Sequence, residues 1–289
     1  MKIFIDANIY ITLYTTKSAI SFLDTIQKIS NYIFVTRQIR NEVVRNRLNI
    51  TCQCIKNIED DKNKKANNSN QNQKLQHPNY PDWFSCSNTN EDNKKVYKKV
   101  LQDVYQGKDK ISKVLEAIFK SSTDYTIDQL KRARLRKELG NPPGKPKDPL
   151  GDQISWEQFL DSIVECKGNI FVVSADSDFV KKYQGQSFLN PYLMEELIQK
   201  NIDSNQIFAF SDLPSALEKY KELEDRSIVI PSSQELKTLR EEQIKNDNYL
   251  ICRSEGHIPL SYTDGIYLRF RCQRCGQLLA SYLNDDIDC

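Results

Sequence analysis

Histidine is scarce in this sequence, with only two among 289 residues. His77 lies in a polar stretch and His257 lies among cysteines near the C-terminus. Neither is well placed to act as the base of a Ser-His or Cys-His catalytic unit. A catalytic zinc site with three histidines cannot be built from two. The enzyme classes that depend on these arrangements are therefore disfavoured.

The sequence also lacks a long apolar segment. No stretch approaches the roughly 20 continuous apolar residues of a membrane span. The N-terminus reaches Asp6 and Asn8 too early for the apolar core of a signal peptide, and no small-residue cleavage site follows. We therefore expect a soluble cytoplasmic protein without a membrane partner, whose eight cysteines are thiols or metal ligands rather than disulfides.

Changes in composition along the chain predict its organisation, whereas the net charge of +2 says little about partners. Residues 1–230 are expected to form one domain, residues 231–248 a linker helix and residues 249–289 a small module. Within the first domain we expect a loop insertion at about 52–90, because part of it is polar and almost free of apolar groups. A helical insertion at about 91–140 is expected to follow, from apolar stripes at helical spacing.

Acidic residues follow two of the apolar, β-branched runs. Asp6 comes directly after the predicted strand 3–5, and Asp176 follows the predicted strand 169–174. Helical patterns alternate with these runs, which favours a parallel sheet flanked by helices. Because ligands bind outside the carboxyl ends of such strands, both aspartates are expected at the edge where a site would form.

Two further carboxylates lie near predicted helix starts. Glu42 falls in the second turn of a helix for which Thr36 is the expected N-cap, and Asp152 precedes a helix expected from about Ile154. Clustered carboxylates repel one another unless a cation joins them. Mg²⁺ or Mn²⁺ suits an all-oxygen pocket of this kind.

Each residue also has a simpler interpretation. An Asp after a strand is often a turn former or helix cap, which applies to Asp6 and Asp178, and Asp152 could cap its own helix. Glu42 could be a solvated residue that pairs with Arg45. Trp156 is interpreted as core packing rather than substrate stacking. Taken together, the set favours a metal site.

The order of these motifs resembles the PIN domain, a metal-dependent ribonuclease fold. The resemblance rests on Asp6 with Asn8, Glu42, Asp152 and the string SADSDF at 174–179, and it covers about residues 1–215 outside the 52–90 insertion. The string PPGKPKDPLGDQISWEQFL resembles a bacterial PIN-like subgroup. The implied fold is an α/β PIN-like parallel sheet flanked by helices, with a helical insertion and a small C-terminal zinc-binding module.

The resemblance implies residue roles and an activity. Asp6, Glu42, Asp152 and Asp176 would bind Mg²⁺ or Mn²⁺ as the catalytic carboxylates, supported by Asn8, Glu157, Ser174 and Asp178. The implied reaction is endoribonuclease hydrolysis of a phosphodiester by metal-activated water. Many relatives are toxins or defence nucleases. A DNA or flap nuclease, or an inactive scaffold that binds nucleic acid or protein, stays open, as does an inhibitor partner.

A basic segment leads into Asp152. Its predicted phosphate-contacting residues are Arg132, Arg134, Arg136, Lys145 and Lys147. The alternative is a solvated helix face, the usual fate of a run of charges.

Cysteine and histidine recur near the C-terminus as Cys252, His257, Cys272 and Cys275. Two ligand pairs separated by a hairpin-like run suit tetrahedral Zn²⁺, and the arrangement resembles a zinc-ribbon-type finger. A module this small is expected to need its metal to fold. Such a site would be structural, and the finger could contact nucleic acid, the first domain or a protein partner.

Overall fold

The computed structural model describes residues 1–16, 18–67, 81, 90–144, 149–224, 230–232, 259–264, 267–272 and 278–283. The chain divides into two compact units, Met1–Leu236 and Lys237–Cys289. None of the described helices has the length and apolar character needed to cross a membrane.

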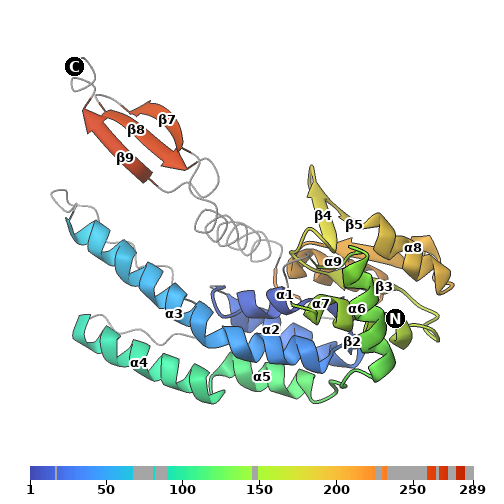
Figure 1. The fold of residues 1–289 in the computed structure, drawn as a ribbon. Helices are drawn as coiled ribbons and strands as arrows, with labels where there is room; N and C mark the ends of the chain where they lie inside the picture. The colour runs from blue at the N-terminus through green and yellow to red at the C-terminus, as the bar shows by residue number, and fades with distance from the viewer. Residues whose placement is uncertain are drawn as a thin grey trace. The chain divides into compact units, whose positions relative to one another are not determined.

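A parallel four-stranded sheet forms the centre of the first unit (Figure 1). Its order is β2-β1-β3-β6, with β1 at Lys2–Ile5, β2 at Ile33–Phe34, β3 at Ile170–Val173 and β6 at Ile207–Phe210. All residues of β3 are buried, as expected for a central strand covered on both faces. The predicted α/β fold with a parallel sheet is therefore confirmed.

Helices cover both faces of this sheet. On one face, α7 (Gly151–Ser162) packs Trp156 and Phe159 against Phe4 of β1, with ring centroids 5.9 and 5.2 Å apart. On the other, α9 (Leu213–Leu223) places Lys219 over the ring of Phe208 in β6. Because side chains alternate along a strand, each strand contributes to both layers. The interpretation of Trp156 as a core residue is confirmed, since its side chain is fully buried.

The helical insertion is present, but the predicted loop is shorter than expected. The helix α3 (Arg37–Asn67) continues through residues 52–67, and α4 (Asn90–Gln106) packs beside it (Figure 1). Ile55 and Ile58 are buried on α3 and hold this part of the helix in place. The loop prediction for residues 52–67 was wrong because polar composition does not prevent a helix from extending once a buried face anchors it.

The remaining helices of the first unit surround this framework. They are α1 (Ala7–Thr12), α2 (Ala19–Lys28), α5 (Lys110–Phe119), α6 (Ile127–Glu138), α8 (Pro191–Gln199) and the short 3-10 helices η1 (Ser30–Tyr32) and η2 (Ser204–Gln206).

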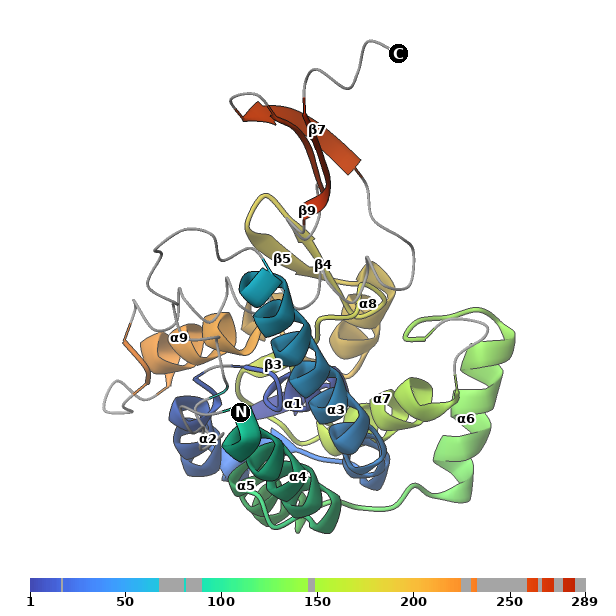
Figure 2. The same ribbon diagram turned by 90° about the vertical axis from the view of Figure 1, so that its left-hand side faces the viewer.

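A short antiparallel hairpin projects from the first unit in both ribbon views (Figure 1 and Figure 2). It consists of β4 (Val180–Tyr183) and β5 (Gln186–Leu189). The turn residues Gln184 and Gly185 have φ values of 47° and 82°. Positive φ at both central positions is typical of a two-residue type I′ turn, which favours glycine.

The second unit contains an antiparallel three-stranded sheet, with β7 at Pro259–Asp264, β8 at Tyr267–Cys272 and β9 at Leu278–Leu283. A register shift falls between Phe270 and Arg271. The predicted linker helix lies outside the described residues, apart from positions 231 and 232.

Candidate active site

Asp6 lies at the carboxyl end of β1, directly after Ile5, and is only 5% exposed. One carboxylate oxygen, Oδ1, accepts a hydrogen bond of 2.7 Å from the backbone N–H of Ala7, so Asp6 caps α1. Its Oδ2 accepts hydrogen bonds from Ser174 Oγ at 2.8 Å and from Asn8 Nδ2 at 3.3 Å. The capping interpretation is correct, but it uses only one of the two oxygens. The other oxygen faces the loop that follows β3.

That loop carries Asp176. Ser174 comes directly after β3 and is fully buried. Its hydroxyl accepts a hydrogen bond of 3.1 Å from the backbone N–H of Asp176 while donating to Asp6. Asp176 Oδ1 in turn accepts a bond of 3.0 Å from the backbone N–H of Asp178. Ser174 therefore connects the loops that follow β1 and β3.

Glu42 lies on α3 and Asp152 lies on α7, and these two helices are in contact. Thr36 caps α3 by accepting a hydrogen bond of 3.1 Å from the backbone N–H of Ile39, as predicted, and Glu42 falls in the second turn. The helix α7 begins at Gly151, earlier than predicted, so Asp152 lies within its first turn. The N-cap is Leu150, so Asp152 does not cap this helix.

Gly151 allows α3 and α7 to approach closely. A Cβ atom at this position would lie 2.6 Å from Nε2 of Gln38 on α3. Thr36 Oγ1, at the cap of α3, and Ser155 Oγ of α7 lie 3.0 Å apart and form a hydrogen bond that joins the two helices. Proximity of the two helices places Glu42 and Asp152 within electrostatic range of each other.

Neighbouring carboxylates raise the pKa of Asp6 and of Glu42. Burial, together with the charges of Glu42 and Asp176, raises the pKa of Asp6 to about 7, against the opposing effect of the Ser174 and Ala7 hydrogen bonds. Burial and the charge of Asp152 also raise the pKa of Glu42, with Arg45 acting in the opposite direction. Asp6, Glu42, Asp152 and Asp176 thus form one electrostatically connected set.

The donor set fits a hard divalent cation, because it consists of carboxylate oxygens. Among the described residues, no Lys or Arg makes an ion pair with the buried Asp6. No group of three or more His, Cys, Asp or Glu side chains in the described ranges lies close enough together to hold a metal ion as it stands. Mutual repulsion opposes the approach of carboxylates to one another, and a cation would offset it.

Glu157 belongs to a different set of interactions. It is buried and accepts hydrogen bonds from Arg132 Nε at 2.8 Å and from Arg136 Nη2 at 2.6 Å. Its predicted supporting role beside Asp152 therefore does not agree with the structure. The helical offset between the two positions directs Glu157 to α6 rather than toward Asp6.

Two of the predicted phosphate-contacting arginines are paired with carboxylates of the protein itself. Arg136 is 6% exposed and also pairs with Glu196 at 2.5 Å, while Arg132 pairs with Asp128 and with Asp161 at 2.6 Å. The prediction was wrong for Arg136, because both acidic partners come from other helices and leave its guanidinium unavailable to a phosphate. Arg134 is exposed on the same helix.

Several predicted residues lie outside the described part of the chain. They are Lys145, Lys147, Cys252, His257 and Cys275. Cys272 is the last residue of β8.

A parallel sheet with carboxylates at the carboxyl ends of its strands is typical of α/β proteins that bind their ligands at this edge. The chain belongs to the PIN domain family, whose profile matches residues 3–179. This range contains Asp6, Glu42, Asp152 and Asp176. PIN domains are typically nucleases that use Mg²⁺ or Mn²⁺ and act on nucleic acid. No curated protein and no solved structure matches the chain significantly.

Proposed function

We propose that this protein is a Mg²⁺- or Mn²⁺-dependent endoribonuclease that hydrolyses phosphodiester bonds in the cytoplasm. The observation that carries the proposal is the buried Asp6, whose pKa is raised to about 7 by burial and by the charges of Glu42 and Asp176. A bound cation would favour the charged form of this carboxyl and offset the repulsion from Glu42 and Asp176. Membership of the PIN domain family supports the same activity.

In this proposal Asp6, Glu42, Asp152 and Asp176 hold the cation, and the chain's other residues position them. A divalent cation bound there would lower the pKa of a water molecule and stabilise negative charge on a phosphoryl oxygen. Ser174 and Asn8 orient Asp6 through Oδ2, and the N-terminal turn of α1 holds Oδ1. No histidine base or covalent protein nucleophile is required, which is consistent with a chain that has only two histidines.

The preference for RNA over DNA is a separate part of the proposal. Carboxylate and cation chemistry acts on the phosphate and not on the sugar, so it does not set this preference. Arg134, Lys145 and Lys147 are proposed to contact the phosphate backbone, whereas Arg132 and Arg136 are left to the ion pairs of α6. A role as a toxin or defence effector, controlled by an inhibitor protein, is compatible with this activity.

The test is incubation with total RNA, single-stranded DNA and duplex DNA, each with Mn²⁺ and with EDTA. We expect Mn²⁺-dependent cleavage of RNA by the natural protein and none by Asp176→Asn. The control is Asp203→Asn, which changes a helix cap on η2 outside the proposed cation set. RNA binding without cleavage in any condition would show an inactive scaffold, and preferential cleavage of DNA would correct the substrate.

We also propose that Cys252, His257, Cys272 and Cys275 bind one structural Zn²⁺ in the second unit. The support is the spacing of these residues and the position of Cys272 at the end of β8. A three-stranded sheet in so short a unit has little apolar surface to bury, so a metal would contribute directly to its folding.

A further inference from the structure

The hairpin formed by β4 and β5 has two faces of different character. The register pairs Lys181 with Phe188 and Tyr183 with Gln186, so these side chains share one face. The pairs Val180–Leu189 and Lys182–Ser187 share the other face.

The inner face is attached to the body of the first unit. Lys182 Nζ lies 3.8 Å from Oδ2 of Asp212, the N-cap of α9. Ser187 Oγ accepts a hydrogen bond of 3.3 Å from the backbone N–H of Ser211. Val180 is buried at the base of the hairpin. These contacts fix which face the hairpin presents to solvent.

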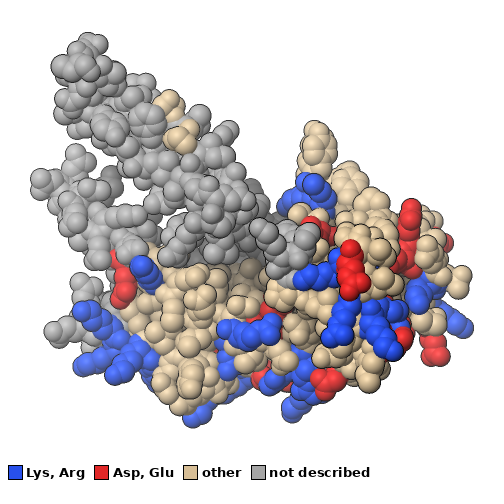
Figure 3. Space-filling view, viewed as in Figure 1, with Lys and Arg blue, Asp and Glu red and all other residues tan. Residues whose placement is uncertain are grey.

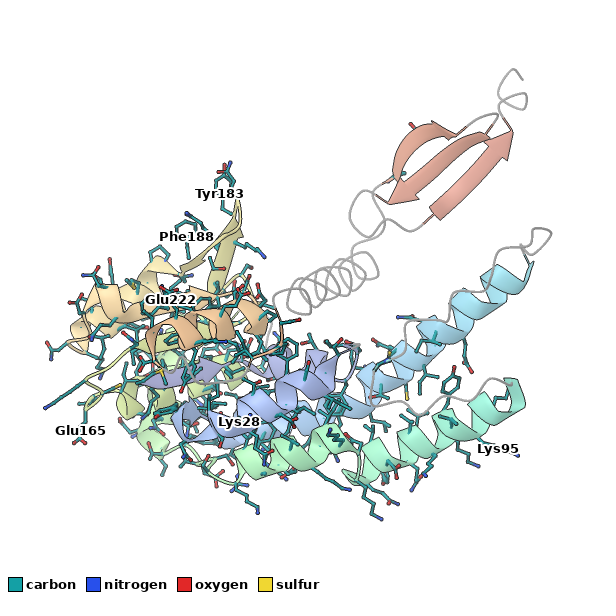
Figure 4. The ribbon with its side chains drawn as sticks, turned by 180° about the vertical axis from the view of Figure 1, so that it is seen from behind. Lys28, Lys95, Glu165, Tyr183, Phe188 and Glu222 are labelled. Carbon is teal, nitrogen blue, oxygen red and sulfur yellow. The ribbon has the colours of Figure 1, made fainter. Side chains whose placement is uncertain are left out.

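The outer face presents two aromatic rings and a lysine. Tyr183 is 66% exposed and Phe188 is 51% exposed, and both point away from the protein in Figure 4. Lys181 is exposed beside them, and Figure 3 shows Lys or Arg atoms next to uncharged atoms on the projecting hairpin. Residues 179–194 contain no Asp or Glu. A face of this composition is complementary to a ligand that has flat rings and negative charge.

The hairpin is joined directly to the loop that carries Asp176. The backbone N–H of Val180 donates a hydrogen bond of 2.9 Å to the carbonyl of Asp176. At the other end of the hairpin, the backbone N–H of Asn190 donates a bond of 2.8 Å to the carbonyl of Phe179. Tyr183 is three residues beyond Val180, which corresponds to about 10 Å along a strand. A nucleic-acid strand bound on the outer face would therefore reach the proposed cleavage site within a few nucleotides.

We propose that Lys181, Tyr183 and Phe188 form a platform on which unpaired bases of a single-stranded nucleic acid stack, with Lys181 contacting the backbone phosphate. The proposal rests on the proposed function in taking this strand to be the substrate. Aromatic side chains stack on any base, because every base has a π-face. Bases inside a duplex are already stacked on their neighbours, so the platform favours single strands.

The experiment measures binding of fluorescent single-stranded and duplex oligonucleotides without added Mg²⁺ or Mn²⁺, where the proposed cleavage does not occur. We expect Tyr183→Ala and Phe188→Ala each to weaken single-strand binding about tenfold, and Tyr183→Phe to retain it. The matched control is Tyr105→Ala on α4, because Tyr105 is 67% exposed and lies on a different element. Circular dichroism and thermal unfolding establish that each variant is folded.

Unchanged binding in the alanine variants would overturn the platform and leave this face to a protein partner. An equal loss with Tyr105→Ala, or an equal loss for duplex, would overturn it as well. Binding without added Mg²⁺ or Mn²⁺ does not depend on catalysis, so the two proposals fail separately. A protein that shows the expected binding pattern but cleaves nothing refutes the nuclease, whereas normal cleavage with unaffected binding refutes the platform.

Discussion

The hydroxyl of Ser174 donates a hydrogen bond of 2.8 Å to Oδ2 of Asp6, although the two residues are 168 positions apart in the sequence. Parallel pairing of β1 with β3 makes this possible, because it places Ile5 opposite Val173 and brings the next residue of each strand to the same edge. The bond lowers the pKa of Asp6 while burial raises it. Ser174 is therefore a positioning residue whose effect is measurable through ionisation.

Replacement of Ser174 with alanine should raise the pKa of Asp6 further. A cation competes with the proton for this carboxylate, so the pH at which Mn²⁺ binds half-maximally should increase by roughly one unit. The measurement is Mn²⁺ affinity as a function of pH. Ser121→Ala, just after α5, which removes a hydroxyl that donates to the nearby carbonyl of Ile118, is the control. An unchanged pH dependence in Ser174→Ala would contradict the positioning role.

Asp6 should make the metal-free protein less stable as the pH rises. Its pKa is about 7 in the folded protein and 3.8 as the ordinary value, so the folded state binds more protons between these limits. The free energy of unfolding should therefore fall between about pH 4 and pH 7, by at most about 4 kcal/mol from this group, and level off above.

Urea unfolding at pH 5 and pH 8 without added Mg²⁺ or Mn²⁺ checks this prediction. Asp6→Asn should reduce the difference between the two pH values, because asparagine keeps the helix cap but does not ionise. Asp124→Asn, at an exposed position, should retain it. The same slope in Asp6→Asn and in the natural protein would show that Asp6 is not the cause.

Loss of the Arg136 guanidinium should destabilise the protein strongly. Arg136→Met leaves the buried Glu157 and the partly buried Glu196 without this partner, at a cost of roughly 3–5 kcal/mol. Arg134→Met is the matched control, because it changes the same residue type on the same helix at an exposed position, where the expected effect is within about 0.5 kcal/mol. Equal unfolding free energies for the two variants would refute the structural role of Arg136.

The purified chain should contain one Zn²⁺ that depends on Cys252 and Cys272. Metal analysis of the natural protein and of Cys252→Ser and Cys272→Ser checks this, with loss of zinc expected in both variants. Cys52→Ser should retain it, because Cys52 is an exposed free cysteine on α3. A natural protein without zinc would remove the proposed site.

The sheet and the two strand-end aspartates were predictable because their signals are local. An apolar run that ends in Asp identifies both the strand and the edge at which Asp6 and Asp176 lie. The cap at Thr36 was predictable for the same reason. These features depend on neighbouring residues, which the sequence displays directly.

The ion pairs of α6 were not predictable, because they join residues from different helices. Nothing near Arg136 in the sequence indicates that Glu157 and Glu196 will surround it, so it was grouped with a basic surface. The hairpin carried a usable signal that was missed, namely a Gln184–Gly185 turn between two short runs with aromatic residues.

Titration of Mn²⁺ at pH 8 tests the central claim most directly, because it needs no knowledge of the substrate. The natural protein should bind Mn²⁺, and Asp6→Asn, Glu42→Gln, Asp152→Asn and Asp176→Asn should each bind it at least about tenfold more weakly. Asp124→Asn should bind it as the natural protein does. A natural protein that binds no Mn²⁺, or four carboxylate variants that bind it with unchanged affinity, would contradict the account.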